Sequence, residues 1–286
     1  MEKTYSDKEI VDYYDQTEVH YKAAWKLDEA KAMHYGFWVV GVKTFAEALL
    51  RMNDEMMQLA EIKNGMKILD AGCGVGGSVI HMTKKKEVEA TGITLSKSQV
   101  ASAIKNAEEE KQIGRAHFLE MNACQTDFPD NTFDVVWGLE SFIHIEDKQS
   151  LFEEVHRILK PGGCLVVGDY FMKEDGTTER EYGRLMKWLN RWAIGDIISA
   201  SSYIHKAESV GLKNEVDRNI TGNIRKSSWR MFYGSIYLSV ISFFYRLYNP
   251  KVRSYADNHW KAMWHQYIAL RKGLWTYRLQ RYRKDK

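Results

Sequence analysis

Proline and cysteine are both scarce in this chain of 286 residues, which contains three of each. So few prolines exclude extended proline-rich linkers. The scattered cysteines, Cys73, Cys124 and Cys164, cannot form a disulfide framework, and their spacing matches no zinc-binding pattern. The first residues lack the apolar stretch of a signal peptide. We therefore predict a cytoplasmic protein with reduced thiols and no metal site.

Acidic residues are scarce in the last quarter of the chain. Residues 220–286 hold 14 Lys and Arg but only two acids, a net charge of +12, against +3 for the whole chain. This asymmetry predicts that the region faces a phosphate, a membrane surface or a nucleic acid, or packs on the acidic remainder of the chain. Bulky apolar residues interrupt the basic ones and no RNA-binding module is recognisable, which argues against nucleic acid. Peripheral membrane contact stays open.

Long hydrophobic runs are missing as well. The uncharged run 231–245 has 15 residues between Arg230 and Arg246, short of the ~20 that a membrane-spanning helix needs. Serine, glycine and tyrosine interrupt it. We predict a buried or interfacial helix here.

Between residues 66 and 171, short β-rich runs alternate with helical patterns. Strands are predicted at 67–71, 88–93, 117–121, 133–137 and 164–169, with helices through 85 and at 96–111 and 148–159. This alternation indicates right-handed βαβ units and a doubly wound parallel sheet.

The flanks of this core read as mostly helical. A helical region at 6–62 precedes it, and helices near 179–194 and 201–210 and a strand at 214–220 follow. We divide the chain into a helical N-terminal lid (1–62), a cofactor-binding core (63–221), and cap helices with a final strand that completes the sheet (222–286).

The most informative segment is the glycine-rich run Ile68-Leu-Asp-Ala-Gly-Cys-Gly-Val-Gly-Gly77. Gly72, Gly74 and Gly76 follow a predicted strand, where glycine permits positive φ and a close approach of the backbone to a ligand. A dinucleotide site would need an acid at the end of the second strand, and Gly92-Ile-Thr-Leu-Ser96 contains none. An acid stands instead at Asp70, where it suits a cationic ligand such as S-adenosylmethionine.

On these residues the chain resembles class I S-adenosylmethionine-dependent methyltransferases, in particular the branch of tocopherol, sterol and terpenoid methyltransferases. Leu69–Ser78 resembles the first motif of that branch, Gly92–Gln99 the second, and Leu159–Gly163 the hairpin before the fifth strand. The resemblance implies an enzyme with a seven-stranded, mostly parallel Rossmann-like sheet, a helical lid and an aromatic-rich helical cap.

The resemblance also implies which residues bind the cofactor. Thr94 and Gln99 would take the place of the acid that holds the ribose hydroxyls, and Asn122 the place of the aspartate that accepts the adenine amino group. An amide oxygen still accepts that bond, without the help of a charge. The full predicted set is Tyr14, Asp70, Gly72, Gly74, Gly76, Thr94, Leu95, Gln99, Asn122, Ala123 and Leu139. Tyr14, or its neighbour Tyr13, would cover the bound methionine moiety from the lid.

Three residues are predicted to act on the acceptor. The resemblance implies His144 and Asp169 as bases, which methyl transfer needs when the nucleophile must lose a proton. Glu140 would either hold a residue of the lid or stabilise positive charge on an alkene-derived cation. The plainer alternatives are a histidine satisfied by backbone at a loop for His144 and a helix or turn cap for Asp169, and for Tyr13 and Tyr14 simple packing of the lid on the domain.

The expected reaction is C- or O-methylation of a hydrophobic small molecule of prenylquinol, sterol or terpenoid type. N- or O-methylation of a small amine or sugar is the alternative, and a non-catalytic cofactor-binding module is a third, from another class. The oligomeric state stays open.

Overall fold

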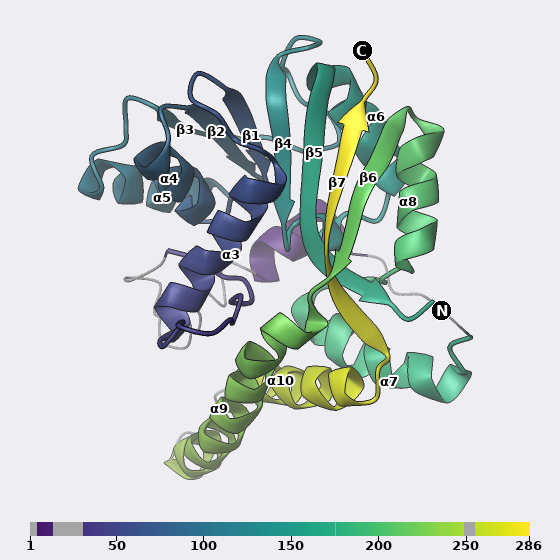
Figure 1. Ribbon diagram of the computed structural model, residues 1–286. Coiled ribbons are helices and arrows are strands. Elements are labelled where there is room, and N and C mark those ends of the chain that lie inside the picture. The colour runs from purple at the N-terminus through teal and green to yellow at the C-terminus, as the bar shows by residue number, and fades with distance from the viewer. Residues whose placement is uncertain (1–4, 14–30, 175, 249–254) are drawn as a thin grey trace.

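The computed structural model describes residues 5–13, 31–174, 176–248 and 255–286. Their centre is one seven-stranded sheet of order β3-β2-β1-β4-β5-β7-β6 (Figure 1). The strands are β1 (Lys67–Ala71), β2 (Glu89–Thr94), β3 (Ala116–Glu120), β4 (Phe133–Leu139), β5 (Leu159–Met172), β6 (Leu212–Asn219) and β7 (Trp275–Lys284). The first five run parallel, and β7 is antiparallel to both of its neighbours. The predicted mostly parallel, seven-stranded sheet is confirmed.

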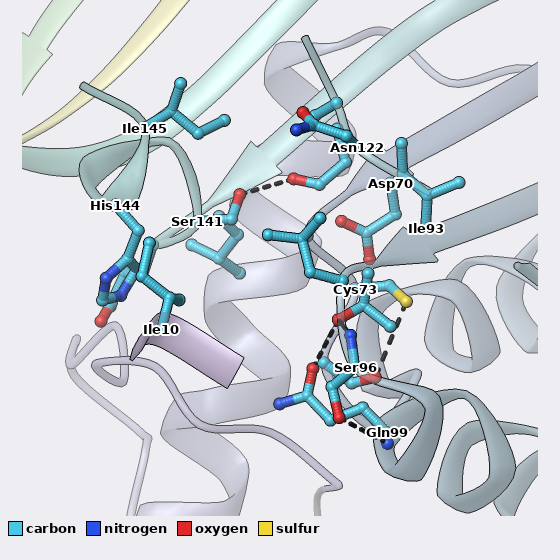
Figure 2. Close-up of a pocket in the computed structure, with 18 of the residues that line it drawn as sticks. Ile10, Asp70, Cys73, Ile93, Ser96, Gln99, Asn122, Ser141, His144 and Ile145 are labelled. Carbon is cyan, nitrogen blue, oxygen red and sulfur yellow. Dashed lines mark hydrogen bonds between the residues drawn. The ribbon is translucent and has the colours of Figure 1, made fainter. Parts of the chain in front are cut away.

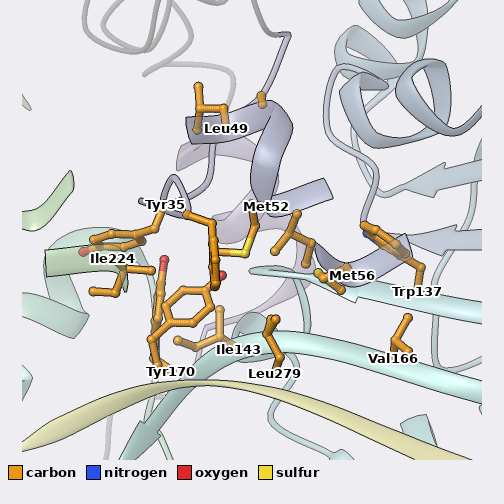
Figure 3. Packing of buried hydrophobic residues seen from close by; sticks show 14 of the residues in the cluster. Tyr35, Leu49, Met52, Met56, Trp137, Ile143, Val166, Tyr170, Ile224 and Leu279 are labelled. Atoms are coloured by element: carbon orange, nitrogen blue, oxygen red, sulfur yellow. The ribbon is translucent and has the colours of Figure 1, made fainter. Parts of the chain in front are cut away.

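Helices cover both faces of the sheet (Figure 1). One face packs against α3 (Phe45–Leu59), α4 (Gly77–Lys85) and α5 (Lys97–Glu109), and the other against α6 (Lys148–Ile158) and α8 (Ala200–Ser209). The alternation along β4 shows why: Val135 and Trp137 belong to the first core, and Val136 between them belongs to the second. On the first face, Met52 and Met56 of α3 pack beside Trp137 and Val166 (Figure 3).

Capping residues set where several helices begin. Ser96 caps α5, as predicted, with its hydroxyl accepting the Gln99 backbone N–H at 3.2 Å. Thr44 and Glu47 form a reciprocal capping box at the start of α3. Because α3 begins only at Phe45, residues 31–44 have no regular secondary structure. The prediction of one helical region over 6–62 is therefore wrong for this segment. A short helix at 7–13 and α3 are the described helical parts of that region.

The C-terminal region forms a helical pair at one end of the sheet (Figure 1). The helices are α9 (Thr221–Tyr248) and α10 (Tyr255–Arg271), which pack on each other, and α10 also packs on α7 (Glu179–Leu189). The uncharged run 231–245 lies within α9. Among the described residues, no helix is long and apolar enough to cross a membrane.

Candidate active site

A pocket of about 520 Å³ opens at the carboxyl ends of β1, β2 and β4, a size typical of small-ligand sites. Figure 2 shows Asp70, Ser96 and Gln99 along one side and His144 and Ile145 along the other. The pocket brings together most of the predicted site residues: Asp70, Gly72, Gly74, Thr94, Leu95, Gln99, Asn122, Ala123, Leu139, Glu140 and His144. Gly76 and Asp169 do not line it, and Tyr14 lies outside the described residues.

The glycine turn fits tightly around its neighbours. Gly72 has φ +98°, and a Cβ atom there would lie 2.2 Å from the Ser141 Cβ. Gly76 has φ +87°, and its Cβ would lie 2.8 Å from the Phe118 ring. Gly76 therefore allows the turn to pack on β3, whereas Gly72 and Gly74 form part of the pocket wall.

Asp70 is the most unusual group in the pocket. Its side chain is 2 % exposed, and no described residue donates a hydrogen bond to its carboxylate. Burial raises the pKa of this carboxyl from 3.8 to about 8. A buried acid without a partner is costly unless a ligand supplies a positive charge or a proton donor. The turn therefore favours a cationic ligand.

Uncharged side chains that form hydrogen bonds line another part of the pocket. The Thr94 hydroxyl donates to Gln99 Oε1 at 2.6 Å, so the two residues predicted to replace the ribose-binding acid lie in contact. Asn122 Oδ1 accepts the Cys124 backbone N–H at 2.8 Å, and its Nδ2 donates to Asp7 Oδ2 at 3.0 Å. The amide thus joins this part of the pocket to the N-terminal helix.

The helix at residues 7–13, within the region predicted as a lid, lies against the pocket. Ile10 and Val11 line the pocket together with Tyr5 and Asp7. Tyr5 fixes the start of the segment, because its N–H donates to Glu146 Oε1 and its hydroxyl donates to the Asn190 carbonyl, both at 2.9 Å. Together with the Asp7–Asn122 bond, these contacts hold the lid to two separate walls of the site.

Glu140 follows β4 with a positive φ of 51°, which is uncommon outside glycine. Its Oε1 accepts the Tyr35 backbone N–H at 2.6 Å and the Tyr277 hydroxyl at 2.8 Å, and its Oε2 accepts the Tyr170 hydroxyl. Burial raises the pKa of this carboxyl to about 8, against the lowering effect of the three hydrogen bonds. Glu140 therefore holds Tyr35, which lies within the region 1–62 predicted as the lid, and does so within a cluster of tyrosines.

The imidazole of His144 is held in one tautomer. Its Nδ1 lies 3.2 Å from the Ala193 carbonyl, which can only accept, so Nδ1 carries the proton and Nε2 the lone pair. Burial lowers the pKa of His144 to about 4, so the ring is neutral at pH 7. A neutral imidazole of this tautomer has the protonation state that a general base needs.

Asp169 lies away from the pocket, contrary to its predicted role as a base there. The strand predicted over 164–169 continues to Met172, so Asp169 lies inside the sheet rather than at its end. Its carboxylate accepts the Tyr170 N–H at 3.0 Å, and burial raises its pKa to about 7, partly offset by the charge of Lys148. Asp169 supports the wall behind the site and does not contact its contents.

Sequence reasoning missed the contribution of the irregular segment 31–35. Met33 and His34 line the pocket, and a Cβ at Gly74 would lie 3.2 Å from Met33 Cε. His34 Nδ1 donates to the Tyr35 carbonyl at 2.9 Å, and its Nε2 is buried with no partner among the described residues. No periodicity marks this segment, and only its tertiary contacts bring it to the pocket.

These features match one ligand. The buried Asp70 with its glycine cradle suits the positive methionine part of S-adenosylmethionine, and the uncharged Thr94, Gln99 and Asn122 suit its adenosine part. A family model for a methyltransferase domain matches residues 69–167. The 27-O-demethylrifamycin SV methyltransferase of Amycolatopsis mediterranei is 30 % identical over 202 residues, which cover 68 % of this chain and 71 % of that protein.

The chain belongs to the S-adenosylmethionine-dependent methyltransferases. Sterol 24-C-methyltransferase of Aspergillus fumigatus is 31 % identical over a match that covers 57 % of the present chain and 42 % of the Aspergillus protein. Phosphoethanolamine N-methyltransferase of Triticum aestivum is 32 % identical over a match that covers 60 % of this chain and 33 % of that protein. The chain therefore spans less than half the length of these two relatives, and the three names differ in their acceptors.

The bond between Asn122 and Asp7 gives a testable prediction for the methyltransferase. Asn122→Asp places two carboxylates side by side and is expected to weaken S-adenosylhomocysteine binding about fivefold, the value of one such bond. Asp7→Asn in the same chain restores a donor and should recover the affinity. Calorimetric titration of both single variants and the double variant measures this coupling. Additive effects of the two changes would contradict it.

Proposed function

We propose that this methyltransferase methylates a hydrophobic small molecule of prenylquinol, sterol or terpenoid type, at carbon or oxygen. The observation that supports it most is the apolar lining beside His144 and Glu140, the two pocket residues predicted to act on the acceptor molecule. Ile10 and Ile145 lie on the same side of the pocket as His144 (Figure 2). Val11, Met33 and Leu139 extend this lining. An acceptor placed there meets apolar side chains beside His144, which favours an apolar molecule.

Each candidate residue suits one version of the reaction. When bound, S-adenosylmethionine supplies a methyl group on a positively charged sulfur. For O-methylation, His144 Nε2 would accept the proton of the acceptor hydroxyl, with Nδ1–H anchored to Ala193. For C-methylation, Glu140 would offset positive charge on the acceptor. The rings of Tyr35, Tyr170 and Tyr277 lie 5.5–5.8 Å apart around it, and all three are buried outside the pocket lining.

A polar amine is the second candidate acceptor. The similarity to phosphoethanolamine N-methyltransferase favours it, and the Glu140 carboxyl group in the pocket lining also suits a small cation. The apolar lining argues for the first candidate, since an amine with a phosphate would need cationic partners in the pocket. Lys31 is the lysine that lines it, and its ammonium is paired with Glu109 at 3.3 Å.

Transfer of labelled methyl groups decides between the two. The protein is incubated with isotopically labelled S-adenosylmethionine and, separately, with lipid and polar extracts of the source cells. We expect label in the lipid fraction, with none from an Asp70→Asn control. Label confined to the polar fraction would refute the hydrophobic acceptor and support the amine.

A further inference from the structure

Helix α9 has two clearly different faces over its first five turns. Ile224, Ser227, Ser228, Met231 and Ser235 are buried and point toward the protein. The exposed side chains are Arg225, Lys226, Trp229, Arg230, Tyr233, Ile236 and Tyr237. At 3.6 residues per turn, these seven fall within an arc of about 140°. This outer face is therefore one continuous surface rather than a scatter of exposed residues.

The outer face combines aromatic and cationic side chains and lacks acids. Trp229, Tyr233 and Tyr237 are 49 %, 51 % and 69 % exposed, and Ile236 is 40 % exposed. The sequence of α9 contains no aspartate or glutamate over its 28 residues. Solvent-exposed helices with so many bare aromatic rings are unusual in a monomer, and such surfaces commonly mark an interaction site.

A second element extends this surface. The loop at 38–43 lies beside α9, because the Trp38 N–H donates to the Asn223 carbonyl at 3.0 Å and Asn223 Nδ2 donates to the Trp38 carbonyl at 3.1 Å. At the tip of this loop Val40 is fully exposed and Val39 is 38 % exposed. Two elements far apart in the sequence thus meet at the start of α9, and both present apolar side chains to solvent.

The cations are held at the base of this surface. Lys226 Nζ lies 3.9 Å from the centroid of the Trp38 ring, and Arg230 Cζ lies 5.0 Å from that of Phe45. Tyr233, Ile236 and Tyr237 lie one to three turns further along α9, away from the sheet (Figure 1). The cationic side chains thus lie near the start of α9, and an apolar, aromatic part of the surface lies further along the helix.

We propose that this surface, formed by the outer face of α9 and the tip of the 38–43 loop, docks on an anionic lipid bilayer. Tryptophan and tyrosine prefer the bilayer interface, and lysine and arginine at its level attract anionic headgroups. The charged side chains on the outer face of α9 are all cationic, so two copies of this face would repel each other.

Docking there connects the membrane with the site. The Ser227 hydroxyl on the buried side of α9 accepts the Gly36 N–H at 3.1 Å, and the adjacent Tyr35 N–H donates to Glu140. A hydrophobic acceptor dissolved in the bilayer would leave it close to the segment that borders the pocket. The docking surface itself does not depend on which acceptor is methylated.

Vesicle binding of the full chain tests the proposal. Phosphatidylcholine vesicles are compared with vesicles that also contain phosphatidylserine, and binding is expected with the second. The triple variant Arg225→Gln, Lys226→Gln, Arg230→Gln should lose about a hundredfold in affinity, at the usual worth of three cations near an anionic surface. The triple variant Trp229→Ser, Tyr233→Ser, Tyr237→Ser should lose tenfold or more, on the order expected for the buried aromatic area.

Matched controls keep the test decisive. Ile113→Ser with Leu119→Ser removes exposed apolar groups near β3, and Lys63→Gln with Lys86→Gln and Lys105→Gln removes exposed cations elsewhere. Both controls should bind vesicles like the parent, and every variant should bind S-adenosylhomocysteine. Absence of binding to either vesicle, or equal losses in the controls, would overturn the proposal. Self-association that the aromatic variant abolishes would assign the surface to a second copy instead.

Discussion

Replacing Asp70 by asparagine is expected to lower the affinity for S-adenosylmethionine by a factor of about 10²–10³, the usual cost of removing one member of a buried charged pair. Asp70 is buried, lines the pocket and has no hydrogen-bond donor among the described residues. Its charge therefore serves a ligand rather than the fold. Asparagine keeps the size of the side chain, so the turn and the glycines beside it should be preserved. Calorimetric titration of parent and variant measures the loss.

The same variant is expected to make the ligand-free protein more stable at high pH. Folding raises the pKa of Asp70 from 3.8 to about 8. The stability associated with this group is therefore complete below about pH 4 and is lost as the pH rises toward about 8. Asparagine cannot ionise, so Asp70→Asn removes this decline. Thermal unfolding at about pH 5 and about pH 9 should show a gap between variant and parent that widens with pH.

Two further measurements make this test of Asp70 strict. Asp127 is an exposed aspartate on the loop before β4, and Asp127→Asn should change neither cofactor affinity nor the pH dependence. Glu140 has a raised pKa as well, but it is present in all three proteins, so its contribution cancels in the comparison. Retained affinity in Asp70→Asn, or an unchanged pH dependence, would show that the carboxylate is not the cation-binding group.

The parts of the site that sequence predicted correctly are short and local. Asp70, Gly72 and Gly74 lie within five residues, and the conformation of that turn depends on the glycines themselves. Thr94 and Gln99 flank the cap of α5, which Ser96 already marks in the sequence. In such segments, neighbouring residues determine the backbone, so a pattern of a few letters carries most of the geometry.

The parts that sequence could not predict depend on distant pairings. Tyr170 and Tyr277 meet around Glu140 because β5 and β7 pair antiparallel in the register that sets these two residues opposite each other. Asp169, one residue earlier, points to the other face of the sheet for the same reason. A longer β5 than predicted moved it from the edge into the sheet. Register is a tertiary property, and no local pattern in either strand encodes it.

Replacing His144 by alanine is expected to lower kcat by a factor on the order of 10²–10⁴ if the reaction is O-methylation, the usual contribution of a general base. Cofactor affinity should be unchanged, because the predicted cofactor contacts lie on other residues. Glu140→Gln should cost less in that case. For C-methylation the order reverses, since Glu140 would then oppose charge on the acceptor. Steady-state rates of both variants decide between them, and unchanged rates in both would refute both assignments.

The dependence of kcat on pH, measured at saturating S-adenosylmethionine so that Asp70 is already paired with its ligand, separates the two roles in the unmodified enzyme. The pKa of His144 is about 4, so a rate that needs its neutral form is already at its plateau at about pH 6 and stays flat above it. The pKa of Glu140 is about 8, so a rate that needs its carboxylate rises between about pH 6 and pH 9. Glu140→Gln should abolish such a rise, and Glu140→Asp should retain it. A rise that survives Glu140→Gln would have to come from another group, because the glutamine cannot ionise.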